Sequence, residues 1–514
     1  MSTFHDDGIS NPTDNPSFDD ILELSRKRRE FLKGSLAAAT ATLIGVPLLS
    51  ARSQAQAQSL SPTYSVTPGV GFAPVPVSDA DTLVVPQGYR AEVLIAWGDP
   101  LSDVSRYFRY DASNSAEDQE LQWGMHNDGM HYFPFNEPTR FNIGQRATPS
   151  SRRGLLVSNH EYTDDGLLHP DGMNNWTAAK VRKSQAALGV SVAEVIFDGS
   201  SWRVQRPSSY ARRITAYTPM AVSGPAAGHA LLRTAADQAG RRILGTFNNC
   251  AHGYTPWGTY LTCEENFNGY FVNAGTLTAE QRRYGISATG AGYRWHEHDE
   301  RFNAALHPNE PNRFGWVVEI DPFDPTSTPI KRTALGRIKH EGAWVTVASD
   351  RRVVVYMGDD ERFEYIYKYV SNRPFIPGDR GHNATLLDDG ILYVARFNDN
   401  QSGEWLPLVW GSNGLTAENG FADQGEVLIK TRLAADRVGA TRMDRPEWIA
   451  VNPRSNDVYC TLTNNDRRGN SGQPATNPAN PRAQNVFGHI IRWTEDEQNA
   501  SARSFQWDLF VQCG

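Results

Sequence analysis

Cysteine is scarce in this sequence, long apolar runs are confined to one end, and neither sign of charge dominates. Four cysteines in 514 residues are too few for the disulfide framework of a secreted mini-domain. The net charge of -8 gives no electrostatic reason to expect nucleic-acid binding. The phosphate-cradling pattern GxxxxGK[ST] is absent.

The one long apolar run follows a basic segment near the N-terminus. Residues 27–33 include the adjacent Arg28 and Arg29, residues 34–50 are uncharged, and residues 55–57 read Ala-Gln-Ala. This order is typical of an export signal, and the paired arginines indicate the twin-arginine type; an uncleaved anchor is the alternative. We therefore predict a signal peptide over residues 1–57, and a mature domain over residues 58–514 that the twin-arginine machinery exports to the periplasm or the medium. No later segment is apolar enough to span a membrane.

The rest of the chain shows little helical periodicity. Short β-branched and aromatic runs alternate with turn residues, and the chain contains 43 Gly and 30 Pro, which favours an all-β fold. Four such runs resemble each other because each ends in polar ligand types, at roughly hundred-residue intervals. They end in His160-Glu161, Glu264-Glu265, Asp359-Asp360-Glu361 and Asn464-Asn465-Asp466. The recurrence favours a β-propeller whose inner strand ends converge; unrelated loop carboxylates on a β-sandwich are the alternative.

Carboxylates that converge repel one another unless protons or cations neutralise them. Carboxylate and amide oxygens suit hard cations such as Ca²⁺. Cys250 differs from the other candidates, since a thiolate is a soft ligand that indicates a transition metal. Its alternatives are a small buried hydrophobic residue or a Cys250–Cys263 disulfide.

Several motifs, considered together, resemble one known family. They are Asn248-Asn249-Cys250-Ala251, Leu261-Thr262-Cys263-Glu264-Glu265-Asn266, Lys339-His340-Glu341-Gly342, Gly358-Asp359-Asp360 and Arg445-Pro446-Glu447. With the twin-arginine leader, and in the same order along the chain, they resemble the PhoX-type alkaline phosphatases. The resemblance implies a monomeric, six-bladed β-propeller with long loop insertions, which carries ferric iron and calcium and hydrolyses small phosphate monoesters.

The resemblance also implies roles for individual residues. Cys250 would bind iron, Asp360 would contribute to calcium sites, and Arg445 would hold the substrate phosphate, with a surface salt bridge as the alternative for this arginine. The metal-binding glutamates would be Glu161, Glu265 or its neighbour Glu264, Glu341 and Glu447. Alternation along a strand sends Glu264 and Glu265 to opposite faces, so the choice between them stays open. Further ligands, or groups that orient the ligands, would be His160, His340 and Asn249.

Two other segments have less definite roles. Residues 122–129, which include Asp128, either supply groups to the central channel or form an ordinary loop. Residues 295–301 carry ligand types, but such a charge run is more often a solvated surface. Two other functions remain open: a calcium-stabilised binding module without catalysis, such as an inactive truncated relative, and a calcium-dependent propeller esterase or lactonase.

The C-terminus departs from the family pattern. Family members continue well beyond the segment that matches residues 505–510, whereas this sequence ends at Gly514. We therefore expect the last part of the propeller to be missing, as in a fragment or a truncated gene. Such a propeller would have open sheet edges.

Overall fold

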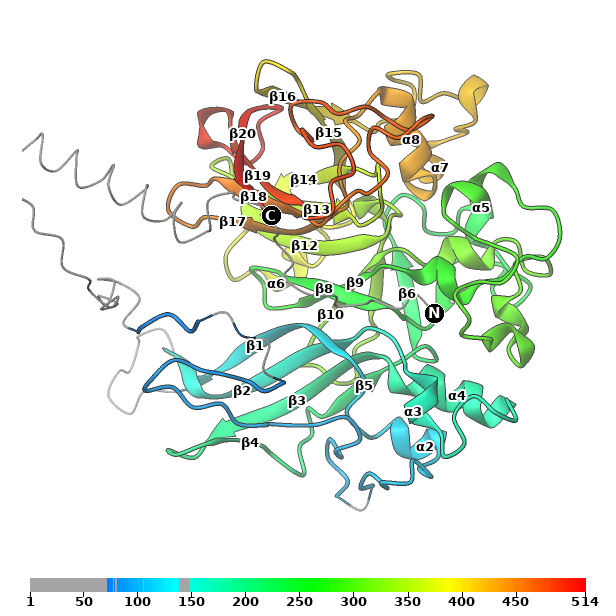
Figure 1. The fold of residues 1–514 in the computed structure, drawn as a ribbon, viewed down its shortest axis with the longest axis vertical. Helices are drawn as coiled ribbons and strands as arrows, with labels where there is room; N and C mark the ends of the chain where they lie inside the picture. Colours follow the sequence, from blue (N-terminus) through cyan, green and yellow to red (C-terminus); the bar gives the residue numbers. More distant parts are fainter. Residues whose placement is uncertain (1–71, 77, 79–80, 105, 138–147) are drawn as a thin grey trace, which may run out of the picture. The chain divides into compact units, whose positions relative to one another are not determined.

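The computed structural model describes residues 72–76, 78, 81–104, 106–137 and 148–514. The predicted signal peptide, residues 1–57, lies outside this set. The chain divides into two compact units, one of residues 1–93 with Gly514 and one of residues 94–513. All helices and strands that the structure describes belong to the second unit (Figure 1). Among the described residues, none of the helices has the length and apolarity that crossing a membrane requires.

Three sheets make up the second unit, and every strand pair is antiparallel except β6 with β11. The first sheet contains β1 (Asn127–Glu137), β2 (Thr148–His160), β3 (Gly189–Phe197), β4 (Trp202–Val204) and β5 (Arg212–Ile214). The second contains β6 (Pro219–Ser223), β7 (Arg242–Leu244), β8 (Asn249–Tyr254), β9 (Tyr260–Glu264), β10 (Val317–Ile320) and β11 (Ile330–Arg332). The third contains β12 (His340–Val347), β13 (Arg352–Asp359), β14 (Ile366–Pro374), β15 (Gly390–Phe397), β16 (Ser402–Pro407), β17 (Pro446–Val451), β18 (Val458–Leu462), β19 (His489–Glu495) and β20 (Ser504–Gln512).

The helices are short and lie in the connections. The α-helices are α2 (Ala116–Gln119), α3 (Asp165–Leu168), α4 (Ala178–Ala187), α5 (Ala279–Arg283), α6 (Arg380–Asn383), α7 (Gln424–Ile429) and α8 (Thr431–Val438). The 3₁₀ helices are η1 (Ala230–Leu232), η2 (Phe267–Tyr270), η3 (Trp295–Glu297), η4 (Glu300–Phe302), η5 (Glu310–Arg313), η6 (Thr333–Leu335), η7 (Ala417–Asn419) and η8 (Asp496–Gln498). Long insertions separate β9 from β10 and β16 from β17. The predicted all-β class is confirmed, whereas radial closure into a six-bladed propeller stays a prediction.

Four β-hairpins repeat one pattern of pairing. They are β1–β2, β8–β9, β12–β13 and β17–β18, hereafter the first to fourth hairpins. In each, the first residue of the leading strand pairs with the last residue of the second strand: Asn127 with His160, Asn249 with Glu264, His340 with Asp359, and Pro446 with Leu462. The next residue then donates its N–H to the carbonyl just before the leading strand, over 2.9 to 3.1 Å: Glu161 to His126, Glu265 to Asn248, Asp360 to Lys339, and Thr463 to Arg445. The predicted recurrence of acid-tipped strands therefore reflects a real structural repeat.

The leading strands also share a β-bulge. The register shifts between Asn127 and Met130, Asn249 and His252, Glu341 and Trp344, and Pro446 and Ile449. A bulge turns a side chain away from the regular alternation of a strand, which is why bulges are common next to functional sites. In the first, second and fourth hairpins the shift includes the second residue of the leading strand. In the third it begins directly after that residue, Glu341, which pairs with Gly358.

The four leading strands adjoin one another in chain order, β1 against β8, β8 against β12, and β12 against β17 (Figure 1). Glycine permits this approach. A methyl group added at Gly129 of β1 would lie 2.8 Å from the carbonyl oxygen of Cys250, and one added at Gly253 of β8 would lie 1.8 Å from that of Ala343. Any larger residue would push the strands apart, so these glycines bring the hairpin ends together.

Candidate metal centre

Each hairpin directs two side chains toward a common centre. One belongs to the second residue of its leading strand, and the other to the residue that follows its second strand. The pairs are Asp128 and Glu161, Cys250 and Glu265, Glu341 and Asp360, and Glu447 and Thr463. We call these residues, without Thr463, the central cluster. Within it, potential ligand atoms of Asp128, Glu161 and Cys250 lie within 4.8 Å of one another, and so do those of Cys250, Glu265 and Glu341. One ion could bridge either group, and Cys250 belongs to both.

Cys250 lies at the buried side of the cluster. Its side chain is 3% exposed, and its thiol donates to Glu265 Oε2 over 3.4 Å. Burial and the neighbouring carboxylates, Glu341 first among them, raise the pKa of this thiol well above its ordinary value. Cys250 and Cys263 are both free, and Cys263 packs in the hydrophobic core with Leu261 and Val355. The alternative of a Cys250–Cys263 disulfide is therefore wrong in this structure.

Two deeply buried glutamates have no ion-pair partner among the described residues. Burial and the other carboxylates raise the pKa of both Glu265 and Glu341 well above the ordinary value. Glu265 is 2% exposed, and its Oε1 has no hydrogen-bond partner. A buried carboxylate oxygen without a partner costs free energy unless a proton or a cation compensates it. The donor set therefore fits a metal site.

Asp128 and Glu161 form the more exposed group of the cluster. Burial, and next the charge of Asp128, raises the pKa of Glu161 to about 7. Burial also raises the pKa of Asp128. The sequence left the role of Asp128 open, because the residue begins a strand rather than ending one. It lies within the bulge of β1, and its carboxylate comes within 4.8 Å of ligand atoms of Glu161 and Cys250. The pattern of strand ends gives no sign of it.

Arg445 is the only cation that contacts the cluster directly among the described residues. Its Nε and Nη2 donate to the two oxygens of Asp360 over 2.9 and 2.6 Å, and Nη2 lies 3.6 Å from Glu447. Burial raises the pKa of Asp360 to about 6, although the guanidinium acts in the opposite direction. Arg445 thus links the third and fourth hairpins, and its role in holding a phosphate stays a prediction. Its φ of 58° is unusual for a non-glycine residue.

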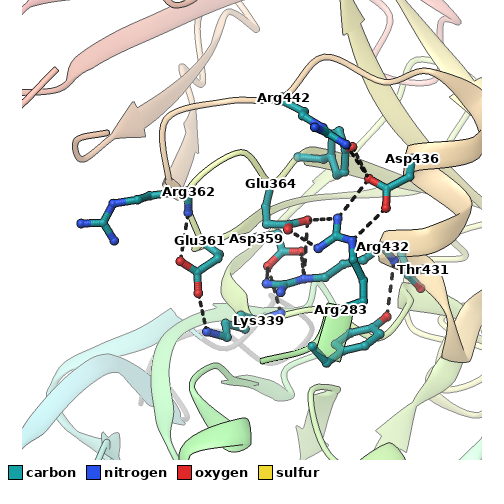
Figure 2. Close-up of polar contacts among 12 residues, drawn as sticks. Arg283, Lys339, Asp359, Glu361, Arg362, Glu364, Thr431, Arg432, Asp436 and Arg442 are labelled. Carbon is teal, nitrogen blue, oxygen red and sulfur yellow. Dashed lines mark hydrogen bonds and ion pairs between the residues drawn. The ribbon is translucent and has the colours of Figure 1, made fainter. Parts of the chain in front are cut away.

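The acids that precede the cluster residues have other partners. Glu264 accepts from Lys331 Nζ over 2.5 Å and from the backbone N–H groups of Gly315 and Trp316 over 3.0 Å. Asp359 forms a buried pair with Arg432, as Figure 2 shows. Of the two adjacent glutamates, the structure thus brings Glu265 into the cluster and leaves Glu264 outside it.

Comparison with known proteins identifies the family of this chain. The sequence model of the family described as alkaline phosphatase PhoX matches residues 70–514. The chain belongs to the PhoX alkaline phosphatase family. A solved structure of Pseudomonas fluorescens PhoX in complex with vanadate, a transition state analogue, is 49% identical, with a TM-score of 0.81 over 86% of this chain and 76% of that chain. A search of curated proteins found no match. The predicted family and the predicted enzyme class are confirmed.

In this PhoX-family chain, three other predicted residues hold strand ends rather than joining a ligand group. His160 Nε2 lies 2.6 Å from Ser191 Oγ, and His340 Nε2 lies 2.8 Å from the Gly336 carbonyl oxygen. Asn249 donates to Thr246 and Thr262. All three are fully buried next to a cluster residue, so a role in orienting Glu161, Glu341 and Cys250 stays a prediction.

Residues 295–301 contribute no metal-binding group in the part of the chain that the structure describes. Trp295 packs in an aromatic core, Asp299 accepts hydrogen bonds from Arg301 and Gln185, and Glu297 pairs with Arg294 at the surface. The charged side chains of this PhoX segment therefore serve the fold.

Proposed function

We propose that this member of the PhoX family is an exported, monomeric enzyme that uses iron and calcium to hydrolyse small phosphate monoesters and release inorganic phosphate. The observation that carries the proposal is the meeting of a buried thiol, six carboxyl groups and one guanidinium at the ends of four hairpins. A calcium-binding module without catalysis, or a calcium-dependent esterase, gives no reason for the thiol or for the phosphate-matching arginine.

The chemistry of the donors assigns the metals. Cys250 with Glu265 and Glu341 combines a soft thiolate with two buried carboxylates, a set that suits ferric iron. Asp128, Glu161, Asp360 and Glu447 offer oxygen donors only and suit calcium. When bound, such cations would polarise the phosphoryl oxygens and stabilise the charge that develops on them.

The protein itself supplies the guanidinium of Arg445. Three of its contacts are to carboxylates of the cluster, but Nη1 makes no hydrogen bond to any described residue, and the side chain is 25% exposed. A planar guanidinium can donate two N–H bonds to two phosphate oxygens at once. Arg445 would therefore hold and orient the ester, and the buried hairpin ends would exclude water from the thiol.

Export accords with this chemistry. The twin-arginine prediction for residues 1–57 implies that residues 58–514 reach the periplasm or the medium after folding, with the metals already bound. The natural substrates would then be small phosphate esters outside the cytoplasm.

Elemental analysis and two substitutions test the proposal. Protein folded in the cytoplasm should contain iron and calcium, and vanadate should inhibit it. Cys250→Ala should lose iron and lower the turnover of a chromogenic phosphate ester by on the order of a hundredfold or more, while Cys263→Ala, a matched change of another buried free cysteine, should retain both. Arg445→Ala should raise KM for the ester. Calcium without iron, wild-type turnover in Cys250→Ala, or a wild-type KM in Arg445→Ala would contradict the proposal.

A further inference from the structure

The fourth hairpin departs from the repeat at one position. In the first three hairpins the residue after the second strand is a carboxylic acid, Glu161, Glu265 or Asp360, whereas in the fourth it is Thr463. We infer that Thr463 makes the fourth hairpin the side of the site that receives the phosphate, and that its hydroxyl positions Glu447. This inference rests on the function proposed above.

Backbone contacts establish that Thr463 is equivalent to the three acids. Its N–H donates to the Arg445 carbonyl over 3.1 Å, the same hydrogen bond that Glu161, Glu265 and Asp360 make in their own hairpins. The bulge of the leading strand is also present, between Pro446 and Ile449. A threonine therefore stands where the repeat otherwise carries a carboxylate.

The side chain of Thr463 contacts the cluster. Its Oγ1 donates to Glu447 Oε1 over 2.6 Å. This hydrogen bond fixes one carboxylate oxygen of Glu447 and adds no charge. The fourth hairpin consequently brings one acidic side chain to the centre, and each of the other three brings two acidic or thiol groups.

The fourth hairpin is also the one that carries a guanidinium at a partly exposed position. Arg445 and Glu447 are partly exposed, as are Asp128 and Glu161 of the first hairpin, whereas Cys250, Glu265 and Glu341 are buried. A phosphate ester carries up to two negative charges, so it is repelled by carboxylates and attracted to the guanidinium. Arg445 already contacts Asp360 and Glu447. A third carboxylate beside it would compete further with the phosphate for this guanidinium, and the hydroxyl of Thr463 does not.

Adding the missing charge tests the inference. Thr463→Asp should weaken the binding of inorganic phosphate to the metal-loaded protein by about tenfold or more, while its iron and calcium contents stay at wild-type levels. The phosphate constant, the dissociation constant of this binding, is measured from inhibition of the enzyme and from thermal stabilisation by phosphate. Thr276→Asp adds the same charge at an exposed loop position and should leave the phosphate constant unchanged. An unchanged phosphate constant in Thr463→Asp, or loss of metal from it, would overturn the inference.

A second pair of variants separates charge from the hydrogen bond and applies even if Thr463→Asp does not fold. Thr463→Val should lower kcat, because Glu447 loses its donor, while the phosphate constant stays within about twofold of wild type. Thr463→Ser should restore kcat. A phosphate constant that rises in Thr463→Val, or a kcat that the serine does not restore, would contradict the inference. Failure of wild-type protein to bind metal or phosphate would instead contradict the proposed function itself.

Discussion

Two pairs of adjacent acids, Glu264 with Glu265 and Asp359 with Asp360, show how this chain separates folding from binding. In each pair the first acid ends a strand and meets a buried cation, Lys331 or Arg432. The second acid lies one residue further and enters the central cluster. One peptide unit therefore separates a carboxylate that pairs with a cation of the fold from one that enters the central cluster, since successive side chains of a strand point to opposite faces.

The surroundings of the two kinds of acid differ in the same way. Asp359 belongs to a buried ion-pair network with Arg283, Glu364, Arg432 and Asp436, drawn in Figure 2, in which each carboxylate contacts at least one guanidinium. The central cluster has more carboxylates than cations, and Glu265 Oε1 has no partner at all. The network is complete without a ligand, whereas the cluster is not.

The largest effect should come from exchanging the two adjacent glutamates for glutamine one at a time. Glu265→Gln removes a proposed iron ligand, so it should lose metal and lower phosphatase turnover by on the order of a hundredfold or more. Glu264→Gln should keep its metals and its specific activity, but it should unfold at lower denaturant concentration, because Lys331 remains buried without its partner. Metal analysis, turnover and urea unfolding of both variants check the contrast. Equal metal loss in the two variants would contradict the claim that Glu265 binds metal and Glu264 does not.

Breaking the ion-pair network should cost stability whether or not metals are bound. Arg432→Met leaves the buried Asp359 and Glu364 without this cation, which should lower the free energy of unfolding by about 3 to 5 kcal/mol. Arg442→Met is the control, since Arg442 is half-exposed and lies 3.6 Å from Asp436, and it should cost less than about 1 kcal/mol. Urea unfolding curves measured with and without metals check this. A cost that vanishes without metals would mean that the network serves the cluster.

The sequence predicted the strand ends, but not which of their residues enter the central cluster and which stabilise the fold. Apolar alternation followed by acids located Glu161, Glu265 and Asp360, because that signal is local. The choice between Glu264 and Glu265 depends on Lys331, which lies 67 residues away in the chain. Asp128 depends on the register between β1 and β2. Thr463 is not a typical metal ligand, so it is identified only by its structural equivalence to Glu161, Glu265 and Asp360.

The pH dependence of metal-free protein should distinguish the cluster from the network. The pKa values of about 7 for Glu161 and about 6 for Asp360 lie above the ordinary 4.5 and 3.8. The folded metal-free protein therefore holds protons that the unfolded chain releases, and this contribution to stability is lost as the pH rises from the ordinary values to about 7. Melting temperatures after chelation should fall over this range, and iron and calcium should abolish the fall. In Glu161→Gln the fall should be smaller. A melting temperature that does not change with pH after chelation would contradict the claim that the metal-free cluster contains carboxylates without a compensating cation.

The smallest effect should come from a residue that holds a ligand in place without binding metal. His340 is fully buried beside Glu341, and its ring contacts the Gly336 carbonyl over 2.8 Å. His340→Gln should loosen this strand end and weaken metal affinity by about tenfold, with saturated protein still active. His382 makes a similar contact with the Pro374 carbonyl over 2.9 Å at the exposed surface, so His382→Gln should leave metal affinity unchanged. Competition with a chelator measures both affinities. If the two variants bind metal equally well, His340 contributes to packing alone. It would then belong with Glu264 and Asp359, which stabilise the fold, although it lies next to the cluster residue Glu341.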